Sequence, residues 1–397
     1  MSICAAVRAG LFSALIAAAW VGGKPEEALA QRPPSVAPTE QARAAPRKHT
    51  DPGKEDPGKE SATSASHFTT GLVTGSPQST EFAVAQDIAT TLASGQETGP
   101  RGEVALRVLP MVGNGGSRNV LDVLTLPDAD MTIAPVVLVD RLREAKTFGD
   151  IRNKLVYVAP MFSQEFHLIV RPEIKSLVDL AGKKVNLGEE GSAGAVLGLE
   201  VLNGLDVKFD AANLGLDAAL DGMRKGQISA AVLLSAKPVD SLARYAQFNA
   251  VRLLPIPYTP AMRREYQPST LRHDDYPTLL GVDEIVDTIA VRSALFAYNW
   301  PRRNERYQLL EFFVQTFFSR FSEFLGDAHH PKWRELNLAE PLPGWKRFAP
   351  AELWLERQAD RGKLDRSPAP SSTGDSPDRG AFDEFLRRRE QDRKQEK

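Results

Sequence analysis

The sequence predicts an α/β fold built as two lobes, and two observations lead to this prediction. Residues 69–348 alternate short apolar runs with amphipathic segments, which is the pattern of strands that alternate with helices. The chain has 397 residues and 42% apolar content, enough to bury a large core and to form two domains. We therefore expect an α/β domain pair between two polar ends of the chain.

The individual elements are predicted from the periodicity of apolar residues and from the glycines that mark turns between them. In the first half we expect a strand at 68–75, a helix at 79–95 ended by Gly95, a strand at 104–113, a helix at 117–126 and a third strand running on through 129–142. The second half predicts strands at 154–162 and 165–171, a helix, strand, loop and helix within 174–205, a helix and strand within 219–234, and a late strand at 286–299.

The last predicted helix covers residues 306–325 and carries an aromatic stripe. Apolar residues recur along it at helical spacing, which is typical of a face packed on a core rather than of a cofactor site. The stripe consists of Phe312, Phe313, Phe317, Phe321 and Phe324.

Both ends of the chain differ in composition from this region. In residues 1–30, Arg8 precedes an apolar run and an Ala-Leu-Ala pattern, which predicts a secretory signal peptide whose apolar run is too short for a membrane span. Residues 31–67 are rich in Pro, Ala and charge and contain the tandem repeat DPGKEDPGKE, so we expect a disordered linker. Residues 361–397 are expected to form a disordered, charged tail.

Composition and motifs exclude several classes of function. The single cysteine, Cys4, lies in the predicted signal peptide, so the mature chain would have no disulfide, no thiolate nucleophile and no cysteine-based metal site. The net charge of −2 shows no excess of positive charge that would indicate binding to nucleic acid. There is no GxxxxGK[ST] run, and GNGGSR does not fit the dinucleotide fingerprint, so no cofactor is expected.

Three Gly/Ser loops, at 74–80, 113–119 and 188–194, each join a predicted strand to a predicted helix. Glycine lets backbone N–H groups approach a ligand, and the first turn of a helix leaves N–H donors unpaired, so such a unit suits an anion. If the two lobes face each other, the three helix starts can converge on one cleft. Gly and Ser also serve as ordinary turn and N-cap residues, which is the alternative for each loop alone.

Five groups of segments follow one another along the chain: GLVTGSPQSTEFAVAQDIA, LRVLPMVGNGGSRNVLDVL, FSQEFHLIVRPEIKSLVDLAGKKVNLGEEGSAGA, the pair ALDGMRKGQISAAVLLSAKP and VRLLPI, and HHPKWRELNLAEPLPGWKRF. Taken as an ordered set, they resemble the solute-binding proteins of TRAP transporters, in the TAXI class, over roughly residues 69–360.

The resemblance implies a two-lobed periplasmic-binding-protein fold of type II, with a ligand cleft between the lobes. Its two crossing hinge strands would be EFHLIVR and VDTIAVRSALF. Lobe 1 would then comprise residues 68–165 plus 296–360, and lobe 2 residues 166–295. His167, in an apolar crossing strand, is expected to be a satisfied core or hinge residue.

Three departures from the family pattern bear on the ligand. Family members look built for glutamate-like amino acids or small dicarboxylates, but here Ser79-Thr80-Glu81 replaces Gly-Thr-Tyr, Ile-Ala-Pro-Val-Val at 133–137 replaces a Gln-Ser-Asp run, and Gly-Ser-Ala-Gly-Ala at 191–195 replaces Gly-Ser-Gly-Thr. A buried carboxylate would lose partners, and Glu81 would repel it. Either the ligand is less acidic, with Glu81 facing an ammonium, or the pocket has lost its solute. Glu81 as an exposed first-turn residue is a further alternative.

The resemblance implies a periplasmic, non-enzymatic and monomeric receptor that delivers a small organic solute, an amino acid or a carboxylate, to a TRAP membrane permease. The alternative is a periplasmic sensor or interaction subunit that keeps the fold without a transported ligand. A hydrolase would need a base beside Ser192 or Ser117. The predicted ligand-binding residues are Ser76, Thr80, Glu81, Ser117, Asn119, Gly191, Ser192, Ala193 and Lys237.

Overall fold

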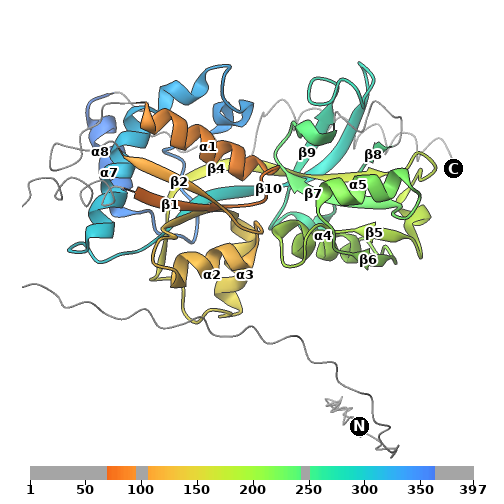
Figure 1. Cartoon of the computed structure of the whole chain (residues 1–397), viewed down its shortest axis with the longest axis horizontal. Helices are drawn as coiled ribbons and strands as arrows, with labels where there is room; N and C mark the ends of the chain where they lie inside the picture. The colour runs from red at the N-terminus through yellow and green to blue at the C-terminus, as the bar shows by residue number, and fades with distance from the viewer. Residues whose placement is uncertain (1–68, 95–105, 243–250, 363–397) are drawn as a thin grey trace, which may run out of the picture. The chain divides into compact units, whose positions relative to one another are not determined.

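A computed structural model describes residues 69–94, 106–242 and 251–362. The predicted signal peptide and linker, and the predicted tail from residue 363 on, lie outside these residues. Figure 1 shows two lobes: one holds the orange N-terminal elements and the blue C-terminal helices, and the other holds the green elements from the middle of the chain. The first lobe is therefore discontinuous in sequence.

The apolar runs of the described residues form one mixed sheet. Its order is β2-β1-β3-β10-β4-β7-β5-β6, with β8 added to β4 and β9 added to β10. The strands are β1 (Thr69–Thr74), β2 (Arg107–Val112), β3 (Met131–Pro135), β4 (Leu155–Val170), β5 (Lys184–Asn186), β6 (Asp210–Ala212), β7 (Ala230–Ser235), β8 (Arg252–Leu254), β9 (Gln267–Arg272) and β10 (Ile285–Tyr298).

Helices cover both faces of the sheet. The α-helices are α1 (Thr80–Ala93), α2 (Ser117–Thr125), α3 (Val136–Glu144), α4 (Ala193–Gly204), α5 (Leu216–Arg224), α7 (Glu305–Ser319) and α8 (Ala349–Asp360). Short 3-10 helices are η1 (Leu177–Leu180), η2 (Pro260–Met262), η3 (Phe321–Leu325) and η4 (Pro331–Glu335). Alternate residues of β10 show the two-sided burial: Leu295 packs into the core of α1 and α7, and Phe296 into that of α2 and α3. A sheet covered on both faces requires such continuously apolar strands.

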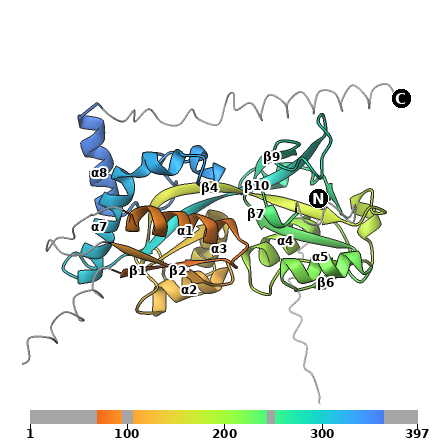
Figure 2. The ribbon, with the colours of Figure 1, turned by 45° about the horizontal axis from the view of Figure 1, so that its top comes forward.

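Strands β4 and β10 run through both lobes (Figures 1 and 2). One half of β10 pairs with β3 through residues 293–297, and the other half pairs with β9 through residues 285–290. Residues 165–170 of β4 pair with β7, and β4 pairs antiparallel with β10 along most of its length. This is the two-lobed, type II periplasmic-binding-protein fold. The predicted lobe limits, at 165 and 296, lie within these two strands.

Two segments differ from the sequence prediction. Residues 154–171, predicted as two strands, form the single strand β4, because β10 pairs with it on both sides of the polar Ser163–Gln164 step. The strand predicted through 129–142 ends at Pro135, and helix α3 begins at Val136. The valines of α3 have a high propensity for strands. The helix forms because it buries Leu138 and Leu142, which lie one helical turn apart on the same face.

The predicted aromatic stripe of α7 and η3 is confirmed as core. Phe313, Phe317 and Phe324 are fully buried, while Phe312 and Phe321 pack partly buried against the same cluster. Trp333 of η4 completes it, with its ring stacked 4.4 Å from that of Phe324. These contacts hold the C-terminal helices on lobe 1.

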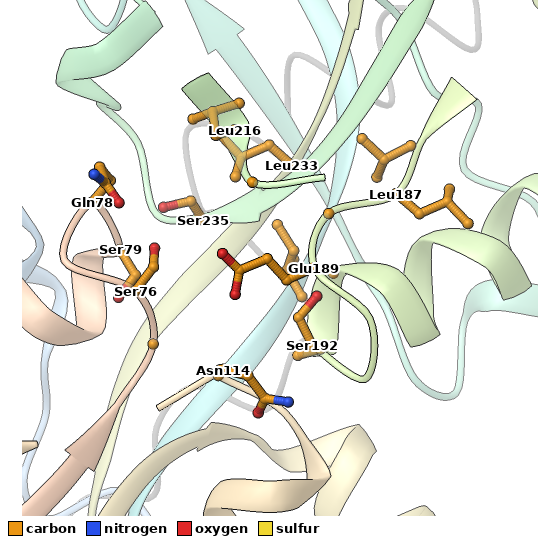
Figure 3. A pocket seen from close by; sticks show the side chains of 18 of the residues that line it. Ser76, Gln78, Ser79, Asn114, Leu187, Glu189, Ser192, Leu216, Leu233 and Ser235 are labelled. Atoms are coloured by element: carbon orange, nitrogen blue, oxygen red, sulfur yellow. The ribbon is translucent and has the colours of Figure 1, made fainter. Parts of the chain in front are cut away.

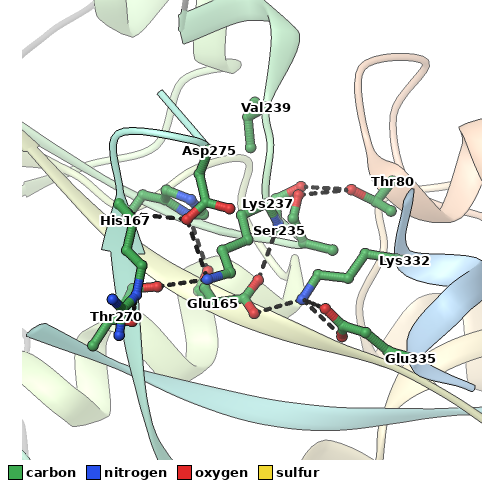
Figure 4. Close-up of polar contacts among 12 residues, drawn as sticks. Thr80, Glu165, His167, Ser235, Lys237, Val239, Thr270, Asp275, Lys332 and Glu335 are labelled. Carbon is green, nitrogen blue, oxygen red and sulfur yellow. Dashed lines mark hydrogen bonds and ion pairs between the residues drawn. The ribbon is translucent and has the colours of Figure 1, made fainter. Parts of the chain in front are cut away.

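A buried ion pair lies where β4 crosses between the lobes (Figure 4). Lys332 Nζ lies 2.7 Å from Glu165 Oε1, and the two side chains are only 3% and 2% exposed. Glu335 supplies a second carboxylate at 2.9 Å from the same ammonium. Burial lowers the pKa of Lys332, but the two carboxylates outweigh it and raise the pKa, so the ammonium stays charged. Glu165 also accepts a hydrogen bond from the backbone N–H of Lys237, at 3.0 Å.

His167 of β4 is a buried, fully bonded residue beside this pair, as predicted. Its Nε2 lies 2.6 Å from the Tyr276 hydroxyl, and its Nδ1 lies 3.1 Å from the carbonyl of Glu165. The Tyr276 oxygen accepts from the N–H of Val239 at 3.2 Å, which leaves its proton for Nε2. The imidazole is therefore neutral, with its proton on Nδ1. Burial lowers the pKa of His167 to about 4.

Because of this low pKa, acid should destabilise the protein through His167. Between pH 6.5 and pH 4 the unfolded chain binds a proton that the folded chain does not, so the stabilisation is complete above pH 6.5 and is lost as the pH falls toward 4. We expect His167→Gln to remove about 2–3 kcal/mol of the fall in the free energy of unfolding between pH 7 and pH 4.5.

Urea denaturation of both proteins at the two pH values measures this difference. Glu81, Asp130 and Glu165, whose pKa values burial raises, titrate in both proteins, so their contributions cancel in the comparison. Parallel pH profiles for wild type and variant would show that His167 has no such role.

Candidate functional site

The three predicted Gly/Ser loops all join a strand to a helix in the structure. The first begins α1, where the Ser79 hydroxyl caps the helix by accepting from the N–H of Phe82 at 3.2 Å. The second begins α2 with Gly116 at the N-cap position. The third begins α4, where the Ser192 hydroxyl accepts from the N–H of Ala195 at 3.1 Å. Side-chain caps thus fix the starts of α1 and α4, whereas α2 begins without one.

A cavity of about 110 Å³ lies among these loops and the end of β7. Figure 3 shows Ser76, Ser79 and Asn114 from lobe 1 opposite Glu189 and Ser192 from lobe 2. The cavity is smaller than the roughly 300 to 1,000 Å³ of pockets for drug-sized ligands. It is lined by Gly75, Ser76, Gln78, Ser79, Glu81, Asn114, Gly115, Gln164, Asn186, Leu187, Gly188, Glu189, Ser192, Ala193, Gly194, Gly215, Leu216, Val232, Leu233, Leu234 and Ser235.

Glu81 is the buried ionisable group of the cavity wall. Its Oε1 accepts from the side-chain amide of Gln164 at 2.7 Å, and that amide also donates to Ser293 at 2.8 Å. Burial raises the pKa of Glu81, against hydrogen bonds from its own N–H, the Ser79 hydroxyl and Gln164. Glu81 lies in the first turn of α1, where the helix dipole favours negative charge.

The second and third loops, which both contribute to the cavity wall, touch each other. Gly116 and Ser192 form an isolated antiparallel bridge, and the N–H of Ala193 donates to the carbonyl of Gly115 at 3.2 Å. The approach is so close that a Cβ on Gly116 would lie 1.9 Å from the carbonyl oxygen of Gly191. The structure thus represents a closed arrangement of the two lobes, held by backbone contact.

Four of the predicted ligand-binding residues line the cavity: Ser76, Glu81, Ser192 and Ala193. Ser117 and Gly191 lie in the same loops but not on the wall. Glu81 is 6% exposed, so the alternative of an exposed first-turn residue is wrong.

The other three predicted residues have structural partners. The Thr80 hydroxyl donates to the carbonyl of Ala236 at 3.2 Å and lies 3.1 Å from the Ser235 hydroxyl, so it joins α1 to the end of β7. The Asn119 amide donates to the carbonyl of Thr74 at 2.7 Å and ties two loops together. Lys237 points to Asp275, at 3.2 Å, and to the carbonyl of Thr270.

Sequence reasoning missed several lining residues. Four of them lie inside the three predicted Gly/Ser loops: Gln78, Ser79, Asn114 and Glu189. The sequence located these loops but did not show which of their side chains face the cavity. Gln164 carried a signal, because it is a polar residue between two apolar runs of β4. Leu216 and Ser235 carried none, since only the packing of α5 and β7 brings them to the cavity.

In the described part of the chain, the Ser192 hydroxyl has the Ala195 N–H as its hydrogen-bond partner, and neither His nor Lys lines the cavity. No group of three or more His, Cys, Asp or Glu side chains within residues 69–94, 106–242 and 251–362 could hold a metal ion. Among the same residues, no helix has the length and apolar character to cross a membrane.

Comparison with known proteins gives the family. Residues 72–342 match the model of the NMT1-like family. The chain belongs to that family. No curated protein matches the chain.

Solved structures similar to this NMT1-like protein are distant in sequence. A mutant of the arginine-binding protein ArgBP from T. maritima is 16% identical, with a TM-score of 0.40, and the match covers 68% of this chain and 96% of that one. The alkanesulfonate-binding protein SsuA from Xanthomonas axonopodis pv. citri bound to MOPS is 13% identical (TM-score 0.40; 75% and 94% covered). A TRAP periplasmic solute-binding protein from Citrobacter koseri with bound D-glucuronate is 15% identical (TM-score 0.36; 75% and 90% covered).

Proposed function

We propose that this NMT1-like protein is an extracytoplasmic receptor that captures a small organic solute between its lobes and delivers it to a TRAP-type membrane permease. The observation that carries the proposal is the cavity built by loops of both lobes beside the crossing strands β4 and β10, with hydroxyl, amide and carboxyl groups in its wall. The ordered set of segments that resemble TAXI-class receptors supports the TRAP assignment, and residues 1–30, with the pattern of a signal peptide, support export.

The solute would be held by hydroxyls, amides and helix-start N–H groups. From lobe 1 we propose Ser76, Gln78, Ser79, Glu81 and Asn114, from the crossing Gln164, and from lobe 2 Ser192, Ala193 and Ser235. Thr80, Ser117, Asn119, Gly191 and Lys237 would act indirectly, by supporting the loops and the strand ends that carry those residues.

Closure would couple binding to delivery. A solute that contacts both lobes binds the closed form better than the open one and shifts the population toward it, by as much as its affinities for the two forms differ. A permease that recognises the closed arrangement would then distinguish loaded from empty receptor.

Thermal unfolding across a panel of amino acids, amines, carboxylates and neutral polar solutes tests the receptor function. A solute at a hundred times its dissociation constant should add about 2.7 kcal/mol of stability, a shift of several degrees in Tm. Stabilisation by one chemical class supports the proposal, and no stabilisation by any class contradicts it.

Ser192→Phe should abolish the stabilisation by any such solute, because the ring would occupy the cavity where Ser192 meets the second loop. Ser192→Thr is the matched control, since threonine keeps the capping hydroxyl and should keep the solute effect. The quantity to compare is the increase in Tm on adding solute, because loss of the cap alone lowers the Tm of the phenylalanine variant. An unchanged increase would show that the cavity is not the solute site.

A second candidate function is a periplasmic sensor or interaction subunit without a transported solute. The small size of the cavity and the direct backbone contact of Gly116 with Ser192 favour it. A well-folded protein that no solute class stabilises is the result expected from this alternative.

A further inference from the structure

The charged groups that line the cavity are all acidic. Among the described residues, the wall contains Glu81 and Glu189 and no Lys, Arg or His. Glu189 is exposed, whereas Glu81 is buried. A solute that enters this cavity therefore meets carboxyl groups and no basic side chain of the described residues.

Glu81 differs from the other buried carboxylates in its partners. Three acidic side chains are buried in the described part of the chain, and two of them have a cation: Glu165 has Lys332 at 2.7 Å, and Asp130 has Arg306 at 3.0 Å. Glu81 has hydrogen bonds from neutral donors only. Glu81 therefore lacks the cation that the other two carboxyl groups possess. Burial of an ion without an opposite charge is costly.

The partners of Glu81 also lie at the cavity. Ser79 and Gln164 bond to the Glu81 side chain, and Gln164 is itself held by Ser293. All three of Ser79, Glu81 and Gln164 line the cavity, and within the described residues none of the lining side chains is a cation. A solute that enters the cavity can therefore supply the opposite charge that Glu81 lacks.

We propose that the cavity takes a small organic cation, with a primary ammonium group placed against Glu81. This inference rests on the proposed receptor function and names its solute class. A primary ammonium fits better than a quaternary one, since no aromatic ring lines the described wall, whereas quaternary ammonium sites are built from aromatic cages. The ammonium can donate to Glu81, and the hydroxyl and amide side chains of Ser76 and Asn114 line the same cavity. The cavity volume of about 110 Å³ favours a short-chain solute.

Titration calorimetry of the full chain with three sets of short-chain probes tests the charge preference. The ammonium set is n-butylamine, putrescine, cadaverine and 4-aminobutyrate, the anionic set is butyrate and succinate, and the neutral set is 1-butanol and 1,4-butanediol. We expect binding only within the ammonium set, and 4-aminobutyrate against n-butylamine shows whether a carboxylate on the same solute helps. Binding of an anion or a neutral probe without the amines overturns the inference but leaves the receptor function standing. Binding of no probe overturns the inference, and the receptor function is then decided by the thermal-unfolding panel.

Glu81→Gln separates the charge from the shape of the cavity. The amide keeps the size of the side chain and can still accept from Gln164, but it removes the charge. We expect ammonium binding to weaken about 10- to 100-fold, the range for loss of a charged hydrogen bond. Glu189→Gln removes a charge from an exposed lining residue and should change affinity by less than about threefold.

Equal affinity of wild type and Glu81→Gln would overturn the proposal. Circular dichroism checks that each variant is folded, and Glu81→Asp provides a second variant that keeps the charge. Ammonium binding by Glu81→Asp with none by Glu81→Gln supports the charge assignment, and binding lost equally in both overturns it.

Discussion

Replacing Lys332 with methionine will lower the free energy of unfolding by about 3–5 kcal/mol, because it leaves the Glu165 carboxylate buried without its cation. Glu165 is only 2% exposed, and Lys332 Nζ at 2.7 Å is the nearest positive charge given to it by the structure. Methionine keeps most of the volume of the lysine side chain, so packing around η4 is little changed. Urea denaturation at pH 7 measures the effect.

Two further variants separate charge from packing. The double variant Glu165→Gln with Lys332→Met should recover much of the loss, because no unpaired charge remains. Glu335→Gln removes the other, half-exposed carboxylate and should cost less than about 1 kcal/mol. A Lys332→Met variant as stable as wild type would show that the ion pair does not hold the crossing together.

Replacing Gly116 with alanine will keep the two lobes from closing as they do in this structure. The added Cβ would lie 1.9 Å from the carbonyl oxygen of Gly191, a contact that two backbone segments can relieve only by moving apart. The backbone of Gly116, with φ of −125°, is open to any residue, so the effect comes from the contact and not from strain. If the clash costs the closed form about 3 kcal/mol, solute affinity falls roughly 100-fold.

The test of Gly116 does not depend on knowing the solute. Small-angle scattering should give a larger radius of gyration for Gly116→Ala than for wild type, and the N–H of Ala193, which donates to Gly115 in the closed form, should exchange faster. Gly204→Ala is the matched control, because a Cβ there meets no atom within 4 Å and it lies at the end of α4, away from the contact. Scattering and exchange identical to wild type would contradict a closing role for Gly116.

The candidate site was predictable where its chemistry is local. Ser79 and Ser192 sit before apolar helices in Gly-rich loops, and both cap their helices through hydrogen bonds to residues three positions on. Such contacts need nothing from the rest of the chain, so the loops could be located from sequence. Asn119 and Lys237, by contrast, are predicted as ligand contacts but bind groups that are distant in sequence. The Asn119 side chain donates to the carbonyl of Thr74, and Lys237 forms an ion pair with Asp275.

The α/β class, the strand-to-helix loops and the core-facing aromatic stripe follow from the sequence, because periodicity and capping depend on neighbours within a turn or two. Only the tertiary structure decided that residues 155–170 are one strand, because β10 pairs along it, and that α3 is a helix, because its face is buried. It also decided that Glu81 is buried beside a cavity without a cation. The surroundings of Glu81 depend on which distant groups reach its carboxyl group, here Gln164 from β4. A local sequence pattern cannot predict such contacts.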